Sequence, residues 1–171
     1  FARSGDLYAI DFDPDELQTV GEAVPVIEDV GGDPSSGAGY FSIADNGTIT
    51  WLAGAVTASD ALLPGVDDAG TADRLPLSPR GFHQPRFSPD GSRIAFTVGE
   101  VYSGVAGDVW VYDLENQGLT RLTLGGNQLY PLWLPGGGRI AYLSYASDAA
   151  IFARAADGSG AEVRFTPDDG T

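Results

Sequence analysis

The sequence of 171 residues contains no cysteine, no methionine and no lysine, and its only histidine is His83. Without cysteine the chain forms neither a disulfide framework nor a thiolate metal site. A single histidine excludes a multi-histidine metal site. Without lysine there is no ammonium side chain to hold a nucleotide phosphate. We therefore expect no metal ion and no cofactor in this chain.

The sequence also lacks an apolar run of about 18 residues and the pattern of a secretory signal peptide. We therefore expect no membrane insertion. The chain opens on Phe1-Ala2-Arg3 without an initiator methionine. This opening is typical of a processed product or of part of a longer polypeptide.

Positively charged side chains are few: the chain has nine arginines and 24 carboxylates, which gives a net charge of −15. Such a surface repels phosphate backbones and anionic lipids, so we expect neither nucleic acid nor a membrane surface as a partner. Two explanations remain for the acidity. It keeps the molecule solvated and soluble, or it attracts a basic protein partner.

Glycine and proline, in contrast, are abundant, with 24 and 11 residues that recur at intervals. Many short strands joined by tight turns need both residues, since glycine adopts positive φ and proline fixes φ inside a turn. A disordered chain is also rich in these residues. It is excluded by three Trp, seven Tyr and eight Phe, which lie within alternating apolar runs.

The strongest pattern is an internal repeat marked by Phe41, Phe87 and Trp133, which follow one another at intervals of 46 residues. Each aromatic residue belongs to an expected strand that is followed by a turn and by a second strand containing Ile-x-aromatic. The turns differ in sequence, but each joins antiparallel neighbours. They are Asn46-Gly47, Ser88-Pro89-Asp90-Gly91 and three glycines at 136–138.

Further strands complete each repeat. In the first copy the third strand is weak because Pro64 has no amide donor. The N-terminal residues supply the end of a second strand, then a third and a fourth. The expected strands are 1–3, 5–12 and 23–27 at the N-terminus, 61–66 and 73–77 in the first copy, 108–113 and 119–123 in the second, and 150–154 and 162–166 in the third.

These repeats predict an all-β fold, a β-propeller of four-stranded antiparallel blades with about three and a half blades present. A unit of about 45 residues cannot bury both of its faces alone, whereas stacking such units around an axis buries them. A β-sandwich is the alternative, but it does not explain the recurrence. We expect a single propeller region, 1–171, with a partial blade at 1–30 and blades at 38–78, 84–124 and 129–167.

The run from Phe87 to Phe96, Phe-Ser-Pro-Asp-Gly-Ser-Arg-Ile-Ala-Phe, with Asp-Val-Trp-Val-Tyr-Asp at 108–113 and Thr-Arg-Leu-Thr at 120–123, resembles the TolB-like propeller repeat. The opening at 5–13 and 21–26 is similar to propellers attached to bacterial eukaryotic-like Ser/Thr kinases. Such blades occur in periplasmic TolB, in sensor proteins and in prolyl-oligopeptidase-like peptidases. Members of the family usually close with six or more blades. The resemblance implies a periplasmic or extracellular location rather than a cytoplasmic one.

No catalytic residue is expected in this chain. Gly158-Ser159-Gly160 lacks the Gly-x-Ser-x-Gly pattern of a nucleophile elbow and is interpreted as a hairpin turn. The carboxylates from Asp11 to Asp15 resemble the start of a calcium loop, but Glu16 stands where that loop needs glycine, so a solvated turn is predicted. Asn46-Gly47-Thr48 matches a glycosylation acceptor and is already explained by the hairpin.

The tryptophans Trp51, Trp110 and Trp133 lie in expected strands, so packing between blades explains them better than a carbohydrate platform does. Candidate ligand-binding residues are instead those that enter the innermost strands at the mouth of the channel. His83 is either one of them or a partly exposed loop residue. The candidates are Phe82, His83, Gln84, Gln128 and Tyr130, with Leu129 between the last two.

Three functions are compatible with these observations. The first is a non-catalytic propeller module that binds a protein or ligand within a larger bacterial sensor or scaffold protein. The second is the gate of a prolyl-oligopeptidase-like serine peptidase whose hydrolase domain lies outside this sequence. The third is a structural protein that assembles with itself, because open blade edges invite pairing with the remainder of a longer polypeptide or with other copies.

Overall fold

The structure, a computed structural model, describes residues 1–33, 38–53, 64–66, 72–78, 81–99, 107–146 and 149–166. Their regular structure consists of strands in five antiparallel sheets. Three sheets have four strands each, hydrogen-bonded in the order of the sequence, which makes each one a meander. Within the described part of the chain, no helix is long and apolar enough to cross a membrane.

The N-terminal sheet contains β1 (Ala2–Arg3), β2 (Asp6–Asp13) and β3 (Gln18–Ile27). The turn after β2 is held by Asp13, whose Oδ1 accepts the backbone N–H groups of Asp15 and Glu16 at 2.9 and 3.0 Å. This Asx turn fits the predicted solvated turn. β3 begins earlier than the predicted strand at 23–27, because register shifts against β2 and a positive φ at Gly21 allow the pairing to continue past irregular positions.

The first four-stranded sheet follows a small ladder of β4 (Gly32–Asp33) and β5 (Ala38–Gly39), which the sequence pattern did not predict. Its strands are β6 (Phe41–Ile43), β7 (Ile49–Trp51), β8 (Pro64–Val66) and β9 (Ala72–Arg74). The weak strand predicted around Pro64 therefore forms. Pro64 is the first residue of β8 and faces Arg74 in the ladder, and a strand tolerates proline best at its first position. Residues 61–63 of that prediction lie outside the described residues.

The second and third four-stranded sheets repeat one plan. The second contains β10 (Phe82–Phe87), β11 (Arg93–Val98), β12 (Asp108–Asp113) and β13 (Leu119–Arg121). The third contains β14 (Gln128–Trp133), β15 (Arg139–Ser144), β16 (Ala150–Ala155) and β17 (Val163–Arg164). β10 begins two residues before the predicted blade boundary at 84, and β14 begins one residue before the boundary at 129. A break in each ladder accommodates Pro85 and Pro131.

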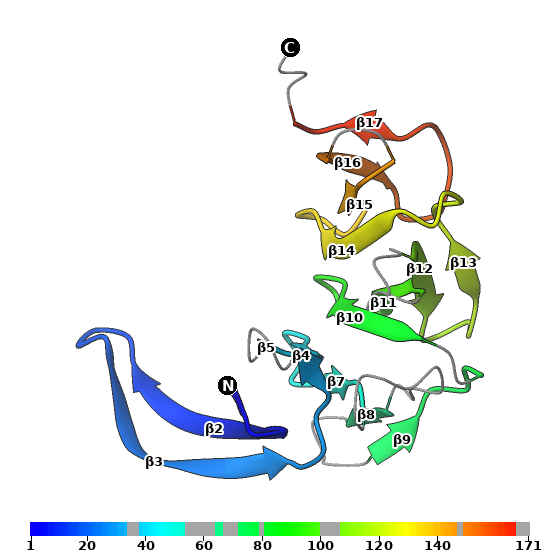
Figure 1. The fold of residues 1–171 in the computed structure, drawn as a ribbon. Helices are drawn as coiled ribbons and strands as arrows, with labels where there is room; N and C mark the ends of the chain where they lie inside the picture. Colours follow the sequence, from blue (N-terminus) through cyan, green and yellow to red (C-terminus); the bar gives the residue numbers. More distant parts are fainter. Residues whose placement is uncertain are drawn as a thin grey trace.

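The sheets follow one another around an arc, with the N-terminal sheet at one end and the third four-stranded sheet at the other (Figure 1). β10 and β14 lie on the concave side of the arc, whereas β9 and β13 lie on its convex side. In the second and third repeats the first strand is therefore the innermost one, as the sequence predicted. The N-terminal sheet and β17 lie at opposite ends of the arc.

The hydrophobic cores lie between sheets and not within them. One cluster joins the first and second four-stranded sheets and includes Ala44, Leu52, Phe87, Phe96 and Tyr112. The other joins the second and third sheets and includes Ala95, Val109, Val111, Trp133 and Tyr142. Trp110 packs against the first cluster, and Trp133 belongs to the second. Stacking thus buries the apolar faces, which is the predicted all-β architecture of four-stranded units.

Candidate binding site on the innermost strands

The innermost strands of the second and third four-stranded sheets, β10 and β14, share a backbone irregularity. Gln84 in β10 and Tyr130 in β14 have left-handed φ values of 54° and 55°, and they occupy equivalent positions of the repeat. The register shifts at both places, between His83 and Arg86 and between Leu129 and Leu132. A bulky residue with positive φ is uncommon inside a strand, and here it coincides with the irregular pairing at both positions.

The side chain of Gln84 holds the irregular backbone at Tyr130 in the next sheet. Its Oε1 accepts the backbone N–H of Tyr130 at 3.0 Å and the hydroxyl of Thr97 at 3.3 Å. Gln84 is 3% exposed and Thr97 is fully buried. Because an unsatisfied buried polar group is costly, this amide both ties β10 to β11 and sets the position of the strand in the next sheet.

Tyr130 is the exposed member of the predicted site, with 56% of its surface accessible. Leu132, two residues further along β14, is 58% exposed and was missed by the sequence interpretation. The repeat alone offered no signal for Leu132, because its equivalent in the preceding sheet is Arg86. Together these two side chains present an aromatic and an aliphatic surface on an innermost strand.

The other predicted site residues are buried and support the strands. The ring of Phe82 meets Phe96 edge to face, with centroids 5.1 Å apart. The amide of Gln128 contacts the hydroxyl of Ser144 at 3.4 Å and accepts the backbone N–H of Asn127 at 3.2 Å. Leu129 is also buried. These three side chains therefore support the strands and do not lie on the accessible surface of the site.

His83 lies inside β10 and is 4% exposed, so it is not the partly exposed loop residue considered from the sequence. Its Nε2 lies 3.0 Å from the carbonyl oxygen of Gly99, and its ring meets Tyr40 edge to face. Since a carbonyl only accepts, Nε2 carries the proton in this contact. Burial lowers the pKa of His83, and the hydrogen bond to Gly99 opposes that shift.

The remaining sequence motifs form turns. Oδ1 of Asp157 accepts the backbone N–H of Ser159 at 2.8 Å, and Oδ1 of Asn46 accepts that of Thr48 at 3.0 Å. No group of three His, Asp or Glu side chains close enough to hold a metal ion occurs among the described residues.

Comparison of whole structures identifies the fold. No protein-family model matches the chain, and no curated protein matches its sequence. The chain is similar to TolB from Acinetobacter baumannii, with 18% identity over 91% of this chain and 37% of that chain and a TM-score of 0.62. The fold is that of a TolB-like β-propeller. Its four-stranded sheets correspond to propeller blades.

Other propellers are also similar to this chain. Oligogalacturonate lyase from Vibrio parahaemolyticus matches with 15% identity over 93% of this chain and 47% of that chain, with a TM-score of 0.62. The β-propeller domain of the Trilobed protease from Pyrococcus furiosus, which has an open velcro topology, matches with 13% identity over 72% of this chain and 41% of that domain, with a TM-score of 0.56. This TolB-like propeller therefore spans less than half the length of the chains it matches.

Proposed function

We propose that this chain is a non-catalytic TolB-like propeller module that binds a protein partner on its innermost strand β14. It works within a larger bacterial sensor or scaffold protein in the periplasm or outside the cell. The observation that carries the proposal is Tyr130, which is exposed on an innermost strand while its backbone is held in a left-handed conformation. Strained backbone maintained by its neighbours is concentrated at functional sites.

The chemistry of this surface favours a polypeptide. Tyrosine gives a large contact area at a low cost in conformational entropy, and it is enriched where proteins meet. Leu132 extends the contact with aliphatic surface. The hydrogen bond from Tyr130 to Gln84 holds the backbone before binding, so little ordering is needed when a partner arrives. An extended, apolar segment fits these properties.

The test measures binding of extended, proline-containing and aliphatic peptides to the dilute chain by fluorescence anisotropy. Tyr130→Gly removes the side chain and keeps a residue that adopts positive φ without strain. We expect it to weaken binding about tenfold or more, as loss of an aromatic anchor does. Tyr145→Ala is the matched control, since Tyr145 is 51% exposed on the loop after β15. Equal affinity of Tyr130→Gly and the native chain, or no binding by any peptide, contradicts the proposal.

A second candidate function is the gate of a serine peptidase. The similarity to the propeller of the Trilobed protease favours it. The test is the reading frame of the parent protein. A continuation into a domain with a Gly-x-Ser-x-Gly nucleophile elbow supports a peptidase, and a continuation into a signalling or anchoring domain supports the recognition module.

A further inference from the structure

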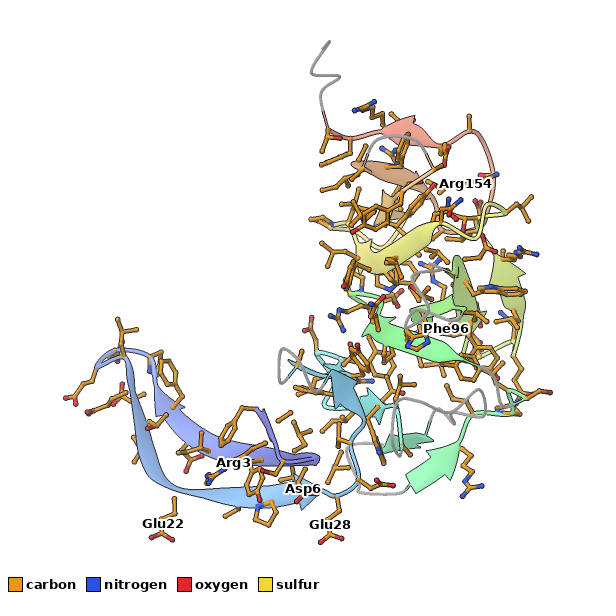
Figure 2. All side chains as sticks on the ribbon, viewed as in Figure 1. Arg3, Asp6, Glu22, Glu28, Phe96 and Arg154 are labelled. Carbon is orange, nitrogen blue, oxygen red and sulfur yellow. The ribbon has the colours of Figure 1, made fainter. Side chains whose placement is uncertain are left out.

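The first strands of the three four-stranded sheets carry no carboxylate. These strands are Phe41–Ile43, Phe82–Phe87 and Gln128–Trp133. Their only arginine is Arg86, in the middle sheet. The 24 carboxylates that make the chain acidic lie in other segments of the sequence, and Glu22, for example, points outward from β3 (Figure 2). An acidic molecule thus has a guanidinium on strands that hold no negative side chain.

Two backbone carbonyls orient the guanidinium of Arg86. Its Nη1 donates to the carbonyl oxygen of Pro85 at 2.8 Å and to that of Phe41, in the preceding sheet, at 3.4 Å. The backbone of Arg86 is held from the other side, because its carbonyl oxygen accepts the indole N–H of Trp133 at 2.9 Å. Contacts with both neighbouring sheets therefore position this residue.

The other edge of the guanidinium has no partner among the described residues. Nε and Nη2 donate no hydrogen bond to them, and neither atom is one of their buried unpaired atoms, so both reach solvent. No described carboxylate forms an ion pair with Arg86, whereas Arg121 contacts Asp108. Nε and Nη2 form a planar fork that matches the two oxygens of a carboxylate. The structure thus leaves a bidentate donor available.

The surroundings of Arg86 favour an anion at this edge. The side chain is half-buried, and burial lowers its pKa without a carboxylate that acts in the opposite sense. Arginine stays charged in spite of such a shift, so an anionic partner offsets the cost of removing the guanidinium from water. β10 belongs to the sheet in the middle of the three, so this environment is part of the interior of the arc.

We propose that Arg86 binds a carboxylate of the partner polypeptide side on, through Nε and Nη2. This inference rests on the proposed function and adds an acidic group to the apolar residues of the partner. Arg86 and Tyr130 lie in the first strands of neighbouring sheets, which are joined by the hydrogen bonds of Gln84 and Trp133. Because packed sheets lie about 10 Å apart, the carboxylate belongs about three residues from the one that contacts Tyr130 in an extended segment.

The net charge of the molecule opposes such a preference. A charge of −15 repels an acidic peptide as a whole, so nonspecific electrostatics favour a neutral peptide. Local recognition by Arg86 predicts the reverse order of affinity. A phosphate group also matches an arginine fork, but it carries up to two negative charges, so the carboxylates of the chain repel it more strongly than they repel a carboxylate.

The test compares peptides on the native chain by fluorescence anisotropy. Each is an extended peptide of proline and leucine, acetylated and amidated, with one Glu or one Gln three residues before or after a central leucine. We expect the Glu peptide to bind about tenfold more tightly than the Gln peptide, as a charge-assisted bidentate contact does. A further peptide has no Glu and a free C-terminus. Tight binding of this peptide also supports the proposal and identifies a chain end as the source of the carboxylate.

Variants assign the preference to Arg86. Arg86→Gln removes the charge, and we expect the ratio of the two affinities to fall to about one. Arg86→Lys keeps the charge without the fork, and we expect an intermediate ratio. Arg139→Gln is the control, since it removes the same charge from an exposed position of β15 and should leave the ratio unchanged. Urea denaturation checks that each variant folds, and the comparison of peptides on the native chain needs no variant.

The outcomes separate this inference from the proposed function. Equal affinity of the Glu, free C-terminus and Gln peptides for the native chain overturns the inference, and so does an unchanged preference in folded Arg86→Gln. Tighter binding of a phosphoserine peptide than of the Glu peptide overturns the choice of carboxylate. If binding depends on Tyr130 but not on a carboxylate, the proposed function stands and this inference fails. If no peptide binds, both fail.

Discussion

At the scale of single residues, His83 connects the stability of the second blade to pH. Burial lowers its pKa in the folded chain, so the unfolded chain binds a proton more readily. The contribution of neutral His83 is therefore fully present above the unfolded pKa of about 6.5, and it is lost as the pH falls toward the lower folded pKa.

We expect the free energy of unfolding to decrease between about pH 7 and pH 5, where carboxylates with ordinary pKa values stay mostly ionised. Because His83 is the only histidine, His83→Gln removes the side chain that titrates in this range. Urea denaturation at a series of pH values measures the effect. A native chain whose stability stays constant over this range, or a variant with the same slope as the native chain, would contradict the prediction.

Gln84 allows a second prediction at this scale. Gln84→Leu removes the acceptor for the N–H of Tyr130 and the hydroxyl of Thr97, and we expect a loss of about 1–3 kcal/mol in the free energy of unfolding. Gln117→Leu is a matched control, because Gln117 is also a glutamine with a φ of 54° but is exposed. Any strain that leucine brings to the left-handed conformation is thus common to both. Equal losses in the two variants would show that the hydrogen bonds contribute nothing.

At the scale of elements, arginine side chains form hydrogen bonds between neighbouring four-stranded sheets. Arg93 donates from Nη2 to the carbonyl of Gly137 at 2.7 Å and lies 4.8 Å from the ring centroid of Trp133. Arg154 donates from Nη1 to the carbonyl of Leu122 at 2.8 Å. A planar guanidinium bonds and stacks at once, which an ammonium group does less well. This geometry gives a physical use for the choice of arginine over lysine.

We therefore expect Arg93→Lys to lower the free energy of unfolding by about 1 kcal/mol, through loss of the stacking and of one charge-assisted hydrogen bond. Arg139→Lys serves as the control, because Arg139 contacts the carbonyl of Ala153 within its own sheet and at 3.5 Å. Chemical denaturation of both variants at one pH measures the difference. If Arg93→Lys and the native chain have comparable free energies of unfolding, lysine replaces the contact of Arg93 with Gly137 and Trp133 without loss, and the prediction is wrong.

The sequence predicted the elements whose pattern is local and missed those that depend on neighbours. The alternation at 108–113 and the turns at Asn46 and Asp90 specify strands and hairpins by themselves. The continuation of β10 through His83 and Gln84 could not be predicted, because Pro85 argues against a strand unless the ladder is broken there.

The candidate site likewise combines positions that the sequence predicted with exposures that depend on the neighbouring sheets. Gln84 and Tyr130 occupy equivalent positions, yet the first is 3% and the second 56% exposed. The third blade covers Gln84, whereas within the described chain no further blade covers Tyr130. Exposure at these positions thus depends on the place of the strand along the arc, which residue type does not encode. Five candidates were named from the sequence, and Tyr130 is the one whose side chain is exposed.

At the scale of the whole molecule, the excess of negative charge lowers the stability of the folded chain. A net charge of −15 on 171 residues raises the free energy of the folded state through self-repulsion. We expect the free energy of unfolding to rise as NaCl is added up to about 0.5 M, because salt shortens the range of this repulsion.

The matched test neutralises charges that make no packing contact. Glu22→Gln with Glu28→Gln removes two exposed carboxylates, one on β3 and one directly after it (Figure 2). This double variant is expected to be more stable than the native chain at low salt and less sensitive to added salt. A stability that falls with salt would indicate instead that ion pairs such as Arg121 with Asp108 dominate.

The position of the two outermost sheets has a mechanical consequence. Because the N-terminal sheet and the third four-stranded sheet lie at opposite ends of the arc, a pulling force applied to these two sheets passes through every interface between the described sheets in series. Each sheet contacts only its neighbours along the arc, so the load is not shared among interfaces as it is in a closed ring. Stretched in an optical trap, the chain would lengthen in successive steps and yield first beside the N-terminal sheet, where Leu7 is the one buried side chain of β2.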